Sequence, residues 1–221
     1  MDSILFFQQM INGFSLGSMY ALIAIGYTMV YGVLRLINFA HGDIMMIGAY
    51  SALFAMTSMN LPFVYALIFA VVVSLILGIS IDKLAYKPLR LAPRISLLIT
   101  AIGVSFLLEN LFQVFFGGTP RPFLVPQFLE QVVSFGSLSV TMGAILVPII
   151  TLVLLCVVLF ILYRTKYGIA IRALAFDIST VHLMGIDANL IIAFVFALGS
   201  SLAAVGGVFY AVSYPSIDPL M

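Results

Sequence analysis

Six long apolar segments constrain the fold of this chain more than any other feature. They cover approximately residues 4–34, 44–59, 62–81, 95–116, 139–162 and 189–212. A helix that crosses the hydrocarbon core of a bilayer needs about 20 mostly apolar residues. No segment alternates apolar and polar residues with the period of two that marks a membrane β-barrel. The pattern predicts an all-α, polytopic transmembrane helix bundle with about six spans, in a single domain over residues 1–221. Segment 44–59 is short, so a full span and a bent or re-entrant element both remain open.

The composition excludes several classes of protein. Hydrophobic residues make up 64% of the 221 residues and charged residues only 8%, whereas soluble domains are about 25% charged. A net charge of +1 lacks the basic signature of nucleic-acid binding. The single cysteine, Cys156, lies in an apolar run, which argues against a disulfide framework or a cysteine-based metal site. We therefore expect an integral membrane protein, with no cofactor, metal or nucleic-acid partner.

Basic residues concentrate in two of the connections between the apolar segments. One connection carries Lys83, Lys87, Arg90 and Arg94, and the other carries Arg164, Lys166 and Arg172. Two spans separate these connections, so both fall on the same side of the membrane. The positive-inside rule places them in the cytoplasm. If segment 44–59 crosses fully, the N-terminus and residues 213–221 lie outside.

Small residues form a stripe along the first and the last apolar segments. Such stripes let helix backbones approach closely. They predict either ordinary packing within the bundle or a helix that lines a translocation path or a subunit interface. We assign five of their members to helix packing: Gly13, Gly17, Ala197, Ala204 and Gly207.

Polar side chains within the apolar segments are the candidates for chemistry. Glu109 lies inside the fourth segment, and a carboxylate there costs about 3 kcal/mol or more unless it faces protein or water. It could contact a substrate, carry a proton or form a structural hydrogen bond, and no second acid in the membrane is expected beside it. Asn38, His41 and Asp43 form a polar patch before the second segment. This patch predicts either a capped turn, with Asp43 near a helix start, or part of a transport path.

The connection 164–188 is long for a link between neighbouring helices. Ile169, Ala173, Phe176 and Leu183 fall on one helical face, which predicts an amphipathic element along the membrane surface. We expect Asp177 to cap a short helix and Gly185 to end it. The element is either a simple interfacial helix or a docking site for a cytoplasmic partner.

The chain has no phosphate-binding loop of the kind that ATPases use. That loop requires a glycine immediately before its lysine, and none of the three lysines, Lys83, Lys87 and Lys166, follows a glycine. If the protein transports a solute uphill, the energy must come from an ion gradient or from another subunit.

Several short motifs span nearly the whole chain and are specific only in combination. The motifs are Asn12-Gly13-x-x-x-Gly17-Ser18-x-Tyr20-Ala21-Leu22, Ile37-Asn38-Phe39-Ala40-His41-Gly42-Asp43, Gly48-Ala49-Tyr50, Tyr86-Lys87-Pro88-Leu89-Arg90, Leu98-Ile99-x-x-Ile102-Gly103-Val104-Ser105, and Gly168, Arg172-Ala173, Asp177 and Gly185-Ile186. Together they resemble the permease subunit of bacterial branched-chain amino-acid ABC importers, the LivH family. Asp43 stands where the family often has Glu, and Glu109 stands where it commonly has a neutral amide.

The resemblance implies a multi-pass protein of the bacterial cytoplasmic (inner) membrane that acts in an assembly. Its partners would be cytoplasmic ATP-binding subunits, a second related permease and a periplasmic or extracellular solute-binding protein. The 164–188 connection would be the coupling loop, with Phe176, Leu183 and Met184 in apolar contact with the ATPase. Arg172, Ala173, Asp177 and Gly185 would complete it, and Asn12, Asn38, His41 and Glu109 are assigned to the substrate path. Family members continue for about two further spans, so we expect this chain to lack the last ones.

Three alternatives remain open from the sequence. A urea or short-amide importer permease shares most of the motifs. An ion-coupled secondary carrier would use Glu109 as its coupling residue. A non-transporting assembly subunit would tolerate changes of the polar residues in the membrane.

Overall fold

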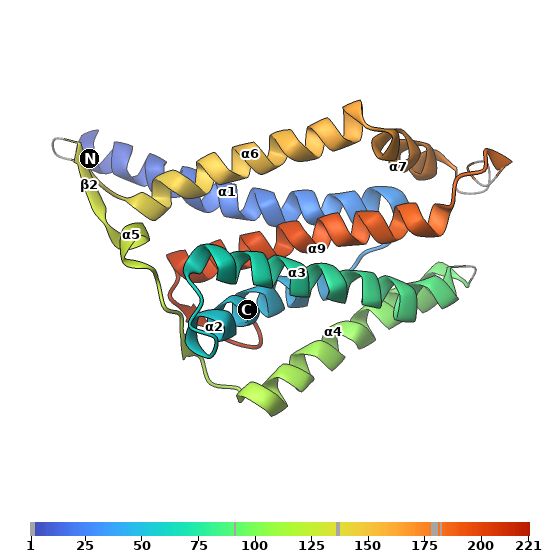
Figure 1. Ribbon diagram of the computed structural model, residues 1–221, viewed down its shortest axis with the longest axis horizontal. Coiled ribbons are helices and arrows are strands. Elements are labelled where there is room, and N and C mark those ends of the chain that lie inside the picture. Colours follow the sequence, from blue (N-terminus) through green and yellow to red (C-terminus); the bar gives the residue numbers. More distant parts are fainter. Residues whose placement is uncertain (1–2, 91, 136–137, 178–180, 182) are drawn as a thin grey trace.

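The computed structural model describes residues 3–90, 92–135, 138–177, 181 and 183–221 (Figure 1). Six long helices dominate this part of the chain, and short elements join them. The long helices are α1 (Ser3–Leu34), α2 (Ala40–Thr57), α3 (Phe63–Ile81), α4 (Arg94–Phe116), α6 (Met142–Arg164) and α9 (Ala188–Ser213). The shorter helices are η1 (Asp82–Tyr86), η2 (Lys87–Leu89), α5 (Gln127–Glu130) and α7 (Lys166–Phe176). Strand β1 (Arg121–Pro122) pairs with β4 (Ser216–Ile217), and β2 (Val132–Phe135) pairs with β3 (Leu138–Thr141).

The all-α transmembrane bundle expected from the sequence is confirmed. Five helices of the described part are long and apolar enough to cross a membrane: Ile4–Leu34, Phe63–Leu89, Arg94–Phe116, Met142–Arg164 and Ala188–Ser213. The sixth long helix, α2, has 18 residues and begins at Ala40. Of the polar patch, His41 and Asp43 therefore lie in the first turn of α2, and Asn38 lies in the segment before it.

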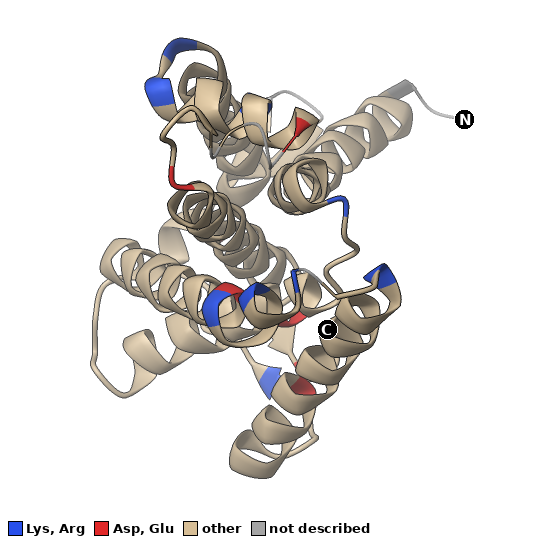
Figure 2. Cartoon of the chain, turned by 90° about the vertical axis from the view of Figure 1, so that its right-hand side faces the viewer, with Lys and Arg blue, Asp and Glu red and all other residues tan. Residues whose placement is uncertain are grey.

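The six long helices run alternately up and down the bundle, so the connections divide between its two ends (Figure 1). At one end the Arg35 side chain bonds to the Ala175 carbonyl, and the Arg90 side chain bonds to Asn189. We call this the basic end, because it carries Arg35 and the basic residues of 82–94 and 164–172; Figure 2 looks onto it. At the opposite end the β1–β4 pair joins the α4–α5 connection to the segment after α9. The two basic connections thus lie at the same end, as the charge pattern predicts, and their cytoplasmic location stays a prediction.

Helix α9 forms the centre of the bundle, and 17 of its 26 residues are buried. Helices α1, α2 and α3 all pack against it. The helices approach closely because small residues of α9 lie directly against the backbone of a neighbouring helix. A Cβ added to Gly207 would lie 2.3 Å from the Met45 carbonyl oxygen of α2. Ala204 of α9 is fully buried against Gly48 of α2. Ala197 of α9 is 8% exposed.

The small-residue stripe of α1 is placed differently from that of α9. Gly13 and Gly17 are exposed, and a Cβ added to either would meet nothing within 4 Å. Helix α1 instead approaches α9 through Gly26, which lies nine residues after Gly17 and therefore on the opposite side of the helix. Within the described part of the chain, Gly13 and Gly17 therefore face away from the packing of the bundle.

Candidate functional site

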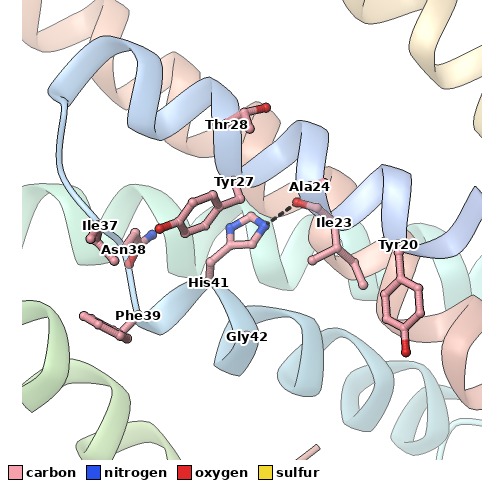
Figure 3. A pocket seen from close by; sticks show the side chains of 10 residues that line it. All are labelled: Tyr20, Ile23, Ala24, Tyr27, Thr28, Ile37, Asn38, Phe39, His41 and Gly42. Atoms are coloured by element: carbon pink, nitrogen blue, oxygen red, sulfur yellow. Dashed lines mark hydrogen bonds between the residues drawn. The ribbon is translucent and has the colours of Figure 1, made fainter. Parts of the chain in front are cut away.

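A cavity of about 510 Å³ lies between the C-terminal half of α1 and the start of α2 (Figure 3). The segment 35–39, which joins the two helices, forms one of its walls. Most lining side chains are apolar or aromatic, and the polar ones come from the patch that the sequence singles out. The walls include Tyr20, Ala24, Tyr27, Phe39, Asn38 and His41. The cavity therefore combines an apolar surface with a few fixed polar groups, as small-molecule sites commonly do.

His41 is fixed between the two helices that enclose the cavity. Its Nε2 lies 3.1 Å from the Ile23 carbonyl oxygen of α1, and its side chain is only 3% exposed (Figure 3). Because a carbonyl oxygen can only accept, Nε2 carries the proton and donates it. The Tyr27 ring lies edge-on to the imidazole at a centroid distance of 5.8 Å. His41 thus ties the first turn of α2 to α1.

Asn38 is held from the other side of the cavity wall. The Tyr86 hydroxyl of η1 donates a 2.8 Å hydrogen bond to the Asn38 Oδ1. Both side chains are buried, and the Asn38 Nδ2 has no partner among the described residues. An unpaired buried donor costs about 1–3 kcal/mol, so it calls for an explanation. A ligand with an acceptor oxygen would supply the missing partner.

Asp43 and Glu109 lie on two helices that pack together, α2 and α4. Asp43 is 6% exposed, with the Ser105 side chain of α4 beside it, and its Oδ2 has no hydrogen-bond partner among the described residues. The charge of Glu109 acts on Asp43 across the packing of the two helices. The spacing of the two residues along the chain gives no sign of this interaction, and the role of Glu109 stays a prediction.

Asn12 lies away from both of these groups. It lines a separate cavity of about 450 Å³ at the opposite end of the bundle from the basic end, together with Glu130 of α5 and Tyr214 after α9. The structure therefore brings Asn38 and His41 into one cavity, and it places Glu109 and Asn12 at two other positions.

The connection 164–188 begins with a helix that is fixed to the end of α6. The Thr165 hydroxyl caps α7 by accepting from the Gly168 amide at 3.1 Å. The Arg172 guanidinium donates to the Leu162 carbonyl and lies over the Tyr163 ring, 5.2 Å from its centroid. The buried side chains of α7 are Gly168, Ala170, Ile171 and Leu174. Helix α7 is thus attached to the bundle along one face.

The apolar face that the sequence predicts along the membrane surface is open in the structure and does not pack on the bundle. Ile169 is 59% exposed and Phe176 is 88% exposed, and Ala173 is only partly buried. Thr165 caps α7, and Asp177 follows its C-terminus and donates its amide to the Ala173 carbonyl. The cap that the sequence predicts at Asp177 belongs to the segment that follows, where residues 178–180 lie outside the described part of the chain.

Three apolar side chains in and after α7 have no cover. Phe176 and Leu183 are each 88% exposed, and Met184 is 74% exposed. Gly185 then adopts a positive φ of 75°, a conformation that glycine takes without strain. Residues 178–180 and 182 lie outside the described part of the chain. Apolar groups this exposed, at the charged end of a membrane bundle, mark a contact surface for protein or lipid.

These features define a multi-pass integral membrane protein with a mostly apolar cavity that carries a few polar groups, and with an exposed apolar surface at its basic end. The family described as branched-chain amino acid transport system / permease component matches residues 9–221. The chain belongs to this family.

Individual relatives support the same family. The high-affinity branched-chain amino acid transport system permease protein BraD of Pseudomonas aeruginosa is 38% identical over 227 residues, which cover 97% of this chain and 73% of the relative. LivH of Escherichia coli K12 is also 38% identical, over 226 residues with the same coverage. A probable LivH of Methanocaldococcus jannaschii is 31% identical over 201 residues, 86% of this chain and 61% of the relative. No solved structure matches this chain.

Proposed function

We propose that the chain is the membrane-spanning subunit of an ATP-driven importer for branched-chain amino acids in the bacterial cytoplasmic membrane. Its partners would be cytoplasmic ATP-binding subunits, a second related permease and a solute-binding protein on the outer side. Family membership supports the permease role. The observation that carries the coupling to a separate ATPase is the exposed apolar surface formed by Phe176, Leu183 and Met184 at the basic end.

The exposed apolar surface lies on and beside a helix, α7, that is firmly attached to the bundle, so a movement of a bound partner would reach the bundle. The opposite face of α7 is buried, and Leu174 on it is only 1% exposed. Arg172 donates to the Leu162 carbonyl and the Thr165 hydroxyl donates to the Ile161 carbonyl, so both fix the helix to the end of α6. A partner that pulls on Phe176 would therefore move α7 as a rigid body together with its neighbours. Residues 172–185 would couple ATP hydrolysis to alternating access in this way.

The cavity beside Asn38 and His41 is the candidate segment of the substrate path. Its apolar walls, among them Ala24 and Phe39, suit an aliphatic side chain. The unpaired Nδ2 of Asn38 suits an acceptor oxygen such as that of a carboxylate. Asn12 would line the entrance at the outer end of the bundle.

The test is leucine-stimulated ATPase activity of the chain reconstituted with its partner permease, ATP-binding subunits and leucine-loaded binding protein. We expect Gly185→Ala to abolish the stimulation, because an alanine at a φ of 75° is strained within the contact surface. Gly117→Ala is the matched control, since Gly117 has a φ of 82° at the opposite end of the bundle. Equal stimulation in both variants would contradict the coupling role of this segment.

A second candidate function is favoured by one observation, a buried carboxylate, Asp43, that interacts electrostatically with Glu109. A buried acid within a membrane bundle can take up and release a proton, which would suit an ion-coupled carrier. Glu109→Gln separates the candidates: an importer keeps its ATP-driven uptake, and an ion-coupled carrier loses uptake driven by a proton gradient. A chain that purifies without ATP-binding subunits and responds to that gradient would favour the carrier. Competition by urea or acetamide would instead favour a permease for short amides.

A further inference from the structure

Arg35 ends α1 in an unusual backbone conformation. Its φ is 51°, and its amide donates to the Tyr31 carbonyl at 2.7 Å. Among the described residues other than glycine, only Asn60 shares a positive φ. Asparagine tolerates the left-handed region, whereas arginine pays a steric cost there. The arginine side chain therefore calls for a reason beyond the turn itself.

That side chain reaches across the basic end to α7. The Arg35 Nη2 donates a 3.1 Å hydrogen bond to the carbonyl oxygen of Ala175, in the last turn of the helix. The last four carbonyls of a helix have no partner within it, and a cation is favourable beside them. Ala175 directly precedes Phe176, the most exposed aromatic side chain of the proposed coupling surface.

Arg35 also begins the short segment that forms a wall of the cavity. Only four residues separate it from the start of α2, and Ile37, Asn38 and Phe39 line the cavity. Asn38 is held in place by the hydroxyl of Tyr86. A displacement of the last turn of α7 can therefore reach the cavity wall through the hydrogen bond of Arg35 to Ala175 and the two or three residues that follow Arg35.

A different kind of link joins the other end of the 164–188 connection to the same wall. Arg90 pairs with Asp82 of η1 at 2.5 Å and donates to the Asn189 side chain of α9 at 2.7 Å. Asp82 is 1% exposed and lies in η1, which also carries Tyr86, so this link is a largely buried ion pair that holds η1 to the residue after η2. The Arg35 link is a single exposed bond to a neutral carbonyl, which is cheaper to break and remake. The ion pair of Arg90 is therefore suited to stay in place during a movement, and the hydrogen bond of Arg35 is suited to break and re-form.

We propose that Arg35 is a positioning residue that transmits the movement of α7 to the cavity wall formed by Ile37, Asn38 and Phe39. This inference rests on the proposed importer function. It adds a specific route between the coupling surface and the candidate substrate path.

The first test compares Arg35→Gly with Asn60→Gly in the reconstituted complex. Both variants relieve a left-handed residue, and only Arg35→Gly removes the contact with Ala175. We expect Arg35→Gly to lower the number of leucine molecules imported per ATP hydrolysed by about fivefold or more, the lower end of common coupling effects. Asn60→Gly should leave this ratio unchanged, and Arg35→Lys should restore part of it. An unchanged ratio in Arg35→Gly would overturn the inference.

A second measurement needs no transport. Spin labels at Ile37→Cys and Ile169→Cys, two exposed positions, report the distance between the cavity wall and α7 in the chain with Cys156→Ser. We expect Arg35→Gly to broaden this distance distribution, and Asn60→Gly to leave it unchanged. An unchanged distribution in Arg35→Gly overturns the link, whatever the complex transports. Absence of ATP-driven leucine uptake in the unaltered complex overturns the proposed function instead, so the two failures can be told apart.

Discussion

The contact between α9 and α2 gives a sharp prediction for Gly207→Ala. The added Cβ would lie 2.3 Å from the Met45 carbonyl oxygen and 2.9 Å from the Met45 Cγ. The nearest obstacle is backbone, so no change of rotamer can relieve it. Helix α9 would have to move away from α2 by about 1 Å to reach ordinary contact distance, and Ala204, one turn away, would lose its contact with Gly48.

The magnitude follows from two opposing effects. Overpacking of a tight contact costs typically about 1–3 kcal/mol. Alanine regains up to about 1 kcal/mol over glycine through its higher helix propensity. We therefore expect Gly207→Ala to lower the free energy of unfolding by about 1–2 kcal/mol. At Gly17, where a Cβ meets nothing within 4 Å, only the propensity gain applies.

The assay is unfolding of the chain in mild detergent by added dodecyl sulfate, followed by circular dichroism. Gly17→Ala is the matched control, because it makes the same chemical change in another long helix. We expect it to be as stable as the unaltered chain or slightly more stable. If Gly207→Ala were as stable as Gly17→Ala, the close approach of α9 and α2 would be refuted.

Three further predictions concern the basic end and the cavity. Gly168→Ala should displace α7, because its Cβ would lie 2.2 Å from the carbonyl oxygens of Ile161 and Leu162; loss of binding to the ATP-binding subunits in a pull-down would show this. Tyr86→Phe should lower stability by about 1–3 kcal/mol in the same unfolding assay, because it leaves the buried Asn38 Oδ1 without its donor. Phe176→Ala should weaken binding of the ATP-binding subunits about tenfold or more, as for an interface hot spot, and leave unfolding unchanged, since Phe176 is 88% exposed. Leu174→Ala should instead lower the stability in the unfolding assay and leave direct contact with the ATP-binding subunits intact, because that side chain is 1% exposed.

The spans and their alternation could be predicted from the sequence because they depend on local properties. About 20 apolar residues suffice to specify a membrane helix, whatever lies beside it. The basic connections were predictable for the same reason, since charges cannot remain within the hydrocarbon region without cost. The boundary of α2 was less certain, because His41 and Asp43 are polar residues that only their packing against α1 and α4 allows inside a helix of this kind.

The neighbours of the functional residues could not be predicted, because they depend on which helices pack together. Asp43 and Glu109 are 66 residues apart, and only the packing of α2 against α4 lets their charges interact. The orientation of α7 depends in the same way on its packing against the end of α6. Thr165 caps α7, and Gly168 lies so close to the Ile161 and Leu162 carbonyls that a larger residue would displace the helix.

The packing of α7 also explains why the coupling surface is apolar and exposed at once. Gly168, Ala170, Ile171 and Leu174 form the face of α7 that is buried against the bundle. Phe176 is the last residue of the helix and lies two residues beyond Leu174, about 200° around the helix axis. Its side chain therefore points away from the buried face and is 88% exposed. The same close packing makes α7 stiff enough to carry a movement to Arg35, so exposure of Phe176 and rigidity of its support have one physical cause.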